Sequence, residues 1–135
     1  MKVGITGSRH GTNDYQLKAI IEFMQSIPLP AELHHGDCVG ADIEVAAVAM
    51  ALSWHVISYP PTDTKLYAKF GGNEVREPAP YLERNRAIVN ATDCLIVAPI
   101  ALTRQHKGGT WYTHDYAKKK NKQVHVFWTK EQTPC

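Results

Sequence analysis

The sequence predicts an α/β fold, a Rossmann-like three-layer sandwich with a mostly parallel five-stranded sheet in the order 3-2-1-4-5. Short β-branched and apolar runs alternate along the chain with segments whose apolar residues recur at helical spacing. Such repeated βα alternation is typical of a parallel sheet that helices cover on both faces. The strand order follows if the first three strands wind outward and the chain then crosses to the other side of the first strand.

The first predicted strand lies in Met1–Thr6 and breaks into the turn Gly7-Ser8-Arg9. A helix follows, and Pro28 and Pro30 end it. Its predicted apolar face comprises Leu17, Ile20, Ile21 and Met24.

The second predicted strand, Glu32–His35, closes in Gly36-Asp37. Small alanines in the helix that follows allow it to lie close to the sheet. Trp54–Tyr59 is the third predicted strand, and Pro60-Pro61 ends it. The predicted apolar positions of the helix are Ile43, Ala46, Ala47 and Met50.

The segment Thr62–Pro80 has no clear periodicity. A loop of this length in a compact domain is usually functional or disordered. The elements after it are regular again. They are a helix at Tyr81–Ala91, a strand at Asp93–Ala98, a helix at Thr110–Lys120 and a strand at Val124–Trp128.

Composition limits the classes of function. The 135 residues, 44% hydrophobic and 21% charged, predict a single domain over 1–135, and a net charge of +2 argues against duplex DNA as a partner. Cys38, Cys94 and Cys135 are an odd number without metal-ligand spacing, which indicates a reducing compartment, no metal site and no cofactor. Since no signal pattern or membrane-length apolar run occurs, we expect a cytoplasmic protein without membrane contact.

Two glycine turns should converge where the predicted strand order reverses. Ligands bind such sheets at this switch point, outside the carboxyl ends of the strands. Gly7-Ser8-Arg9 follows the first strand, and the loop Pro99–Gly109 ends in Lys107-Gly108-Gly109-Thr110 at a helix start. Backbone N–H groups at a helix N-terminus favour an anion such as phosphate. The turn His35–Asp42 should flank the same crevice.

Four motifs carry a resemblance to a known superfamily. In chain order they are GSR, HGDCVGAD, ERNRAIVNATDCLIVAP and GGTW. This set resembles the SLOG superfamily of Rossmann-like proteins, in particular its small single-domain members, over Met1 to Trp128. The superfamily includes the DNA-processing protein A family and the phosphoribohydrolases called lonely guy. The resemblance implies a nucleotide or nucleotide-like ligand, and often a homodimer or higher homo-oligomer.

The resemblance also implies roles for particular residues. Gly36 and Asp42 would shape the pocket, and Arg84 with Asn85 would face the ligand. The residues implied to bind phosphate are Gly7, Ser8, Arg9, Gly108, Gly109 and Thr110.

The chain departs from the phosphoribohydrolase pattern at a position that matters for catalysis. Thr113 stands where those enzymes carry the glutamate that assists cleavage of the N-glycosidic bond. A threonine cannot act as a carboxylate base. Asp115, two residues further, lies roughly 200° around the helix. An enzyme of this class would therefore use another carboxylate, with Asp37 and Glu83 as the candidates.

Three functions remain open from the sequence. The first is a binding module for a phosphorylated, nucleotide-like ligand. The second is a nucleotide N-glycosidic-bond hydrolase or a deoxyribosyl-transfer-like enzyme. The third is single-stranded DNA binding through the segment Glu83–Ile88, which needs a basic path beyond the crevice. Trp111 and Tyr112, beside the glycine turn, are candidates for stacking on a base, whereas His34 and His35 have no metal-ligand spacing.

Overall fold

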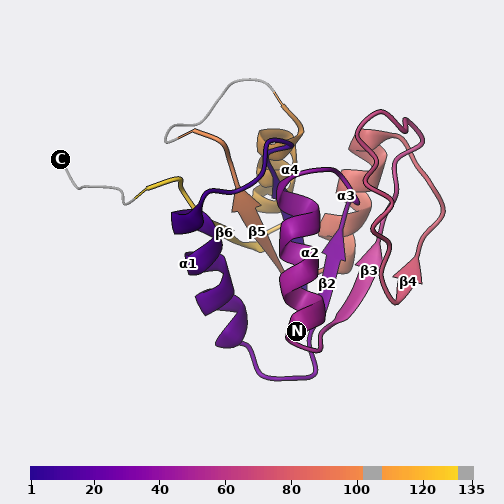
Figure 1. Ribbon diagram of the computed structural model, residues 1–135. Helices are drawn as coiled ribbons and strands as arrows, with labels where there is room; N and C mark the ends of the chain where they lie inside the picture. The colour runs from indigo at the N-terminus through magenta and orange to yellow at the C-terminus, as the bar shows by residue number, and fades with distance from the viewer. Residues whose placement is uncertain (102–107, 131–135) are drawn as a thin grey trace.

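The computed structural model describes residues 1–101 and 108–130 and contains a fully parallel sheet between helices (Figure 1). The strands are β1 (Lys2–Gly7), β2 (Glu32–His35), β3 (His55–Ser58), β4 (Glu74–Val75), β5 (Cys94–Ala98) and β6 (Gln123–Val126). The helices are α1 (Asp14–Gln25), α2 (Ala41–Ala51), α3 (Tyr81–Ala91) and α4 (Gly109–Lys119). No helix in the described ranges is long and apolar enough to span a membrane.

The sheet order is β4-β3-β2-β1-β5-β6. The five strands other than β4 confirm the predicted order 3-2-1-4-5, but the predicted number of strands is wrong because β4 adds a sixth at one edge. β4 lies in the segment predicted to have no regular element. Both of its residues, Glu74 and Val75, are exposed, so no alternation of apolar and polar side chains marks the strand.

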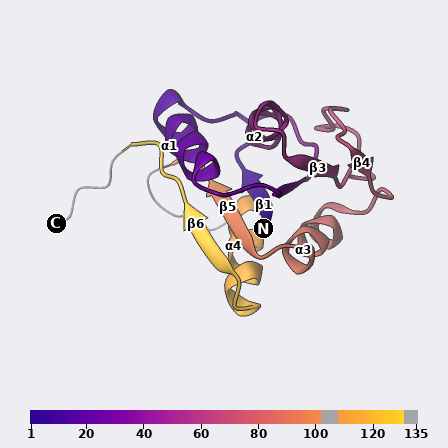
Figure 2. The same ribbon diagram turned by 90° about the horizontal axis from the view of Figure 1, so that it is seen from below.

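The predicted three layers are confirmed. Figure 2 shows α1 and α2 on one face of the sheet and α3 and α4 on the other. Along β5, Ile96 packs in the cluster that contains Met24 of α1, whereas Leu95 and Val97 pack with Val89 of α3. All five residues of β5 are buried for this reason.

The predicted apolar face of α2 is largely wrong. Of its four positions only Ala46 is buried, and Met50 is 46% exposed. The helix instead buries Ala41, Val45 and Ala49 against the sheet. Because α2 is apolar on almost every side, its sequence periodicity does not define which side packs.

The predicted face of α1 is correct at Ile20 and Met24, which are buried, while Leu17 and Ile21 are half-buried. Gln16 takes the remaining inner position. Its side-chain amide donates to the backbone carbonyls of Pro99 and Phe127, which ties α1 to the ends of β5 and β6.

One histidine makes the stability of the fold sensitive to pH. His125 of β6 lies with its ring centroid 4.5 Å from that of Phe23, and its Nε2 atom is buried without a hydrogen-bond partner among the described residues. Burial lowers the pKa of His125 below its ordinary value of 6.5. The unfolded chain therefore binds a proton more readily. The stability linked to this ring is present above pH 6.5 and is lost as the pH falls below that value.

We expect His125→Phe to raise the free energy of unfolding at neutral pH by about 1 kcal/mol, because it removes a buried polar atom that lacks a partner. It should also flatten the decline in stability at acid pH. Urea denaturation at several pH values measures both effects. An unchanged pH dependence, together with an NMR titration of His125 at or above its ordinary pKa, would contradict this account.

Candidate functional site

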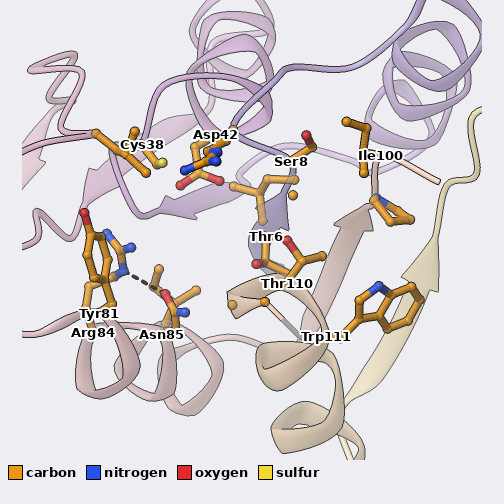
Figure 3. A pocket seen from close by; sticks show the side chains of 18 of the residues that line it. Thr6, Ser8, Cys38, Asp42, Tyr81, Arg84, Asn85, Ile100, Thr110 and Trp111 are labelled. Carbon is orange, nitrogen blue, oxygen red and sulfur yellow. Dashed lines mark hydrogen bonds between the residues drawn. The ribbon is translucent and has the colours of Figure 1, made fainter. Parts of the chain in front are cut away.

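A cleft of about 810 Å³ opens at the carboxyl ends of β1 and β5 (Figure 3). This is the predicted switch point of the sheet. The predicted site residues that line it are Gly7, Ser8, Arg9, Asp42, Arg84, Asn85, Gly108, Gly109 and Thr110. The other three, Gly36, Asp37 and Glu83, do not line it. Lys107, which the sequence placed at the same turn, lies outside the described residues.

The floor of the cleft forms where β1, β5 and α2 meet. A Cβ atom on Gly7 would lie 2.6 Å from the Cβ of Ala41 and 2.8 Å from the carbonyl oxygen of Ala98. Only glycine permits this approach. Gly40 has a φ of +98°, and the N–H of Ala41 donates to the carbonyl of Ser8 at 2.9 Å, so the first turn and the start of α2 are joined.

α4 points its N-terminus at the cleft. Gly108 precedes the helix and provides no side-chain cap, and Gly109 and Thr110 form its first turn on the cleft wall. The first N–H groups of a helix have no acceptor within the helix, and the helix dipole adds partial positive charge there. This end of the cleft is therefore suited to an anion.

Arg84 is fixed within the wall by its surroundings. The side chain is 5% exposed, and its Nη1 donates to the carbonyls of Gly36 and, at 3.0 Å, Tyr59. Its Nε donates to Oδ1 of Asn85 at 2.8 Å, the bond drawn in Figure 3. The guanidinium also lies 5.5 Å from the ring centroid of Tyr81. Few rotamers are open to a side chain held at so many points.

Gly36 acts by leaving space. A Cβ atom on it would lie 2.7 Å from Cζ of Arg84 and 2.9 Å from Oδ2 of Asp42, so both side chains pack against its α-carbon. Its N–H donates to the same Oδ2 at 3.1 Å. Burial raises the pKa of the Asp42 carboxyl above its ordinary value, and the charge of Arg84 opposes that shift.

Asp37, a candidate catalytic residue from the sequence, has a structural position. It is fully buried, and its carboxylate accepts hydrogen bonds from the Ser58 hydroxyl at 2.6 Å and from the N–H groups of Phe70 and Gly71, each at 2.8 Å. The neighbouring His35 contacts the same loop, with its Nε2 2.7 Å from the carbonyl oxygen of Gly71. Asp37 thus anchors the 62–80 segment, whose Leu66 lines the cleft.

The other acidic candidate, Glu83, also lies away from the cleft, and so does Asp115. Glu83 is exposed on α3, and Asp115 is exposed beside His114, 2.9 Å away. Thr113 is buried and donates its hydroxyl to the carbonyl of Gly109 at 2.7 Å. Among the described lining residues, Asp42 is the one carboxylate.

The described residues contain no group of three or more His, Cys, Asp or Glu side chains that could hold a metal. His34 is buried, with its ring nitrogens 2.8 Å from the Tyr59 hydroxyl and 2.9 Å from a Glu32 carboxylate oxygen. Cys38 and Cys94 are free thiols, while Cys135 lies outside the described residues.

The two aromatic candidates at α4 differ in position. Trp111 lines the cleft but is 5% exposed and packs against Trp128, with ring centroids 5.8 Å apart. Tyr112 does not line the cleft, and its hydroxyl accepts a hydrogen bond from Arg86 at 2.8 Å. Trp111 therefore forms part of the wall beneath the α4 end.

The side chains on the cleft wall that the sequence did not single out include Cys38, Leu66 and Tyr81. Tyr81 had a signal, because a residue three positions before Arg84 on a helix lies on the same face. No sequence signal marks Leu66, because a long loop brings it to the cleft. The backbone carbonyl of Leu66 accepts a hydrogen bond from the N–H of Val39 at 2.9 Å. Burial raises the pKa of the Cys38 thiol to about 11, so this thiol is protonated at neutral pH.

We expect Asp37→Asn to lower the free energy of unfolding by about 1–3 kcal/mol, because the new amide places a donor against N–H and hydroxyl donors in a buried position. The amides of Phe70 and Gly71 should also exchange faster with solvent. Chemical denaturation and hydrogen exchange provide the measurements. Asp63→Asn, an exposed change in the same loop, is the control, and equal behaviour of the two variants would contradict the anchoring role.

No family model matches the sequence, and no curated protein matches it. Solved structures do match. The molybdenum cofactor binding protein of the phototrophic bacterium Rippkaea orientalis has a TM-score of 0.70 at 22% identity, over 93% of this chain and 74% of that one. DNA processing protein A of Streptococcus pneumoniae has a TM-score of 0.68 at 18% identity, over 93% of this chain and 49% of that one.

DNA processing protein A of Helicobacter pylori, described as binding single-stranded DNA, has a TM-score of 0.66 at 20% identity, over 93% of this chain and 64% of that one. This chain spans about half the length of the pneumococcal protein. At these identities the likeness concerns the fold. The Rossmann-like fold implied by the resemblance to the SLOG superfamily is confirmed.

Proposed function

We propose that this chain binds a nucleotide or a nucleotide-derived phosphorylated ligand in the cleft. The observation that carries the proposal is the arrangement of its wall. Two features suited to an anion, the start of α4 at Gly109 and the Ser8-Arg9 turn, lie at the carboxyl ends of adjacent strands. Tyr81 and Arg84 form a further wall of the cleft. Its volume of about 810 Å³ is in the range of small-molecule sites.

The phosphate would be held at the α4 side of the cleft. Two uncharged donors of different kinds lie there, the first N–H groups of α4 and the hydroxyl of Thr110. Arg9 adds an exposed positive charge on the opposite turn. Backbone N–H groups and one cation together are the usual means by which proteins bind a phosphate at a glycine turn.

The ring of the ligand would lie toward α3 and the 62–80 loop. Tyr81 and Leu66 provide apolar surface there, and the amide of Asn85 provides polar atoms. A wall of apolar side chains with a few fixed polar groups is typical of a site for a small heterocycle. One solved relative is described as a molybdenum cofactor binding protein, which is consistent with a small-molecule ligand in this cleft.

The alternative of single-stranded DNA binding has support from one relative, the Helicobacter pylori protein, but less from this surface. The run Lys118–Lys120 lies at the end of α4 opposite to Gly109, and the helix of 11 residues separates them by about 16 Å. These lysines therefore do not extend the cleft into a basic path. A phosphorylated small ligand remains the function that the site supports best.

Gly109→Val tests the site directly. A Cβ at this position makes only an ordinary contact, 3.5 Å from Nδ2 of Asn85, so we expect the fold to persist. The added methyl groups should block close approach of a phosphate and lower affinity by about tenfold or more, which is 1.4 kcal/mol. Mass spectrometry of co-purifying molecules and thermal shift with a panel of nucleotides and pterin phosphates identify the ligand to titrate.

The control for this variant is Ala51→Val, which adds the two γ-methyl groups of valine at the exposed end of α2. Parent-like affinity in Gly109→Val would show that the phosphate is not bound at α4. Tight binding of single-stranded oligonucleotides with a steep loss at higher salt would favour DNA instead.

We also expect the parent protein to release no free base from nucleoside monophosphates. Thr113 cannot supply a carboxylate, Asp37 is held by three donors, and Glu83 lies outside the cleft. General acid–base assistance is worth about 10² to 10⁴ in rate, so its presence would be obvious by chromatography. Sustained base release by the purified protein would move the hydrolase to first place.

A further inference from the structure

The carboxylate of Asp42 is unusual for a site that binds phosphate. The side chain is 7% exposed, and it lines the same cleft as Gly109 and Arg9. A buried negative charge repels a phosphate placed against it and costs free energy unless it is compensated. The phosphate must therefore lie elsewhere in the cleft, and a different part of the ligand must face Asp42.

The carboxylate is held in a fixed orientation. Gly36 donates its N–H to Oδ2, a backbone hydrogen bond from Cys38 also stabilises the charged form, and the guanidinium of Arg84 packs against the same face of Gly36. These groups compensate part of the cost of burial. The carboxylate of Asp42 can still accept further hydrogen bonds, because a carboxylate has about four acceptor positions.

The neighbours of Asp42 belong to the ring side of the cleft. Figure 3 shows Asp42 beside Cys38, across from Tyr81 and Arg84, with Ile100 and Trp111 at the far side. The packing of Arg84 and Asp42 against the same glycine confirms that these two are close. A ring that contacts Tyr81 would therefore direct one edge toward the carboxylate.

We infer that Asp42 selects the ligand's heterocycle by accepting hydrogen bonds from two adjacent N–H donors on its edge. Guanine and pterin rings both have such an edge, a ring N–H next to an exocyclic amino group. Adenine has a ring nitrogen acceptor there, which a carboxylate repels. This inference rests on the proposed function and names the ligand class of the same site.

The test uses four nucleotides on the unmodified protein, by isothermal titration calorimetry. GMP should bind about tenfold more tightly than IMP, which lacks the exocyclic amino group, because one hydrogen bond to a charged acceptor is lost. AMP should bind still more weakly. Deoxy-GMP should bind like GMP, since the inference assigns the donors to the ring and not to the ribose hydroxyls.

The second experiment measures the same affinities in the variant Asp42→Asn. The amide keeps one acceptor but loses the charge and the paired geometry, so the preference for GMP over IMP should shrink to about threefold or less. Glu22→Gln, which removes one negative charge from the exposed side of α1, is the control and should keep the parent's preference. If Asp42→Asn fails to fold, the parent's ranking of the four ligands decides alone.

Equal affinity of the parent for GMP, IMP and AMP would overturn the inference while leaving the proposed function intact. A loss of affinity confined to deoxy-GMP would also overturn it, because the donors would then belong to the sugar. Failure of all four nucleotides and of a pterin monophosphate to bind would overturn the proposed function, and the inference with it.

Discussion

The structure depends on one close approach, the meeting of β1, β5 and α2 at Gly7. Any side chain at this position would overlap Ala41 and the backbone of Ala98. Because α2 reaches the sheet here, its first turn joins the Ser8 turn by a backbone hydrogen bond. The cleft opens directly above this junction. The same contact that packs the helix on the sheet therefore sets the floor of the site.

Two buried charged groups then fix the walls. Asp37 holds the 62–80 loop through hydrogen bonds to backbone N–H groups, and Arg84 holds α3 against the turn after β2 through backbone carbonyls. In both cases a charge is satisfied mainly by backbone groups, which cannot move without unfolding a turn. Such fixed walls would give the proposed ligand a preformed cleft, with Asp42 and Tyr81 already in place.

Much of the fold could be predicted because the signals are local. The βα alternation gave the parallel sheet and its central order, and α3 begins and ends as predicted at Tyr81 and Ala91. The side of α2 that packs and the edge strand β4 could not be predicted, since one is apolar all round and the other consists of two exposed residues. These are decided by tertiary contacts.

In the candidate site too, features with a local sequence signal could be predicted and those set by tertiary contacts could not. Glycine turns at strand ends are visible in the sequence, and nine predicted residues line one cleft. The position of Asp37 could not be predicted, because an acid after a strand can serve either a ligand or a loop, and in the structure its carboxylate accepts hydrogen bonds from the N–H groups of Phe70 and Gly71. Leu66 was missed because a long loop carries it to the cleft.

We propose that the glycine turns bind the phosphate of a phosphorylated heterocycle. Calorimetric titration with guanosine and with GMP, and with a pterin and its monophosphate, tests it most directly. We expect that in at least one pair the phosphorylated form binds about 100-fold more tightly than the unphosphorylated form, a difference of roughly 2.7 kcal/mol. Equal affinity within both pairs would contradict it.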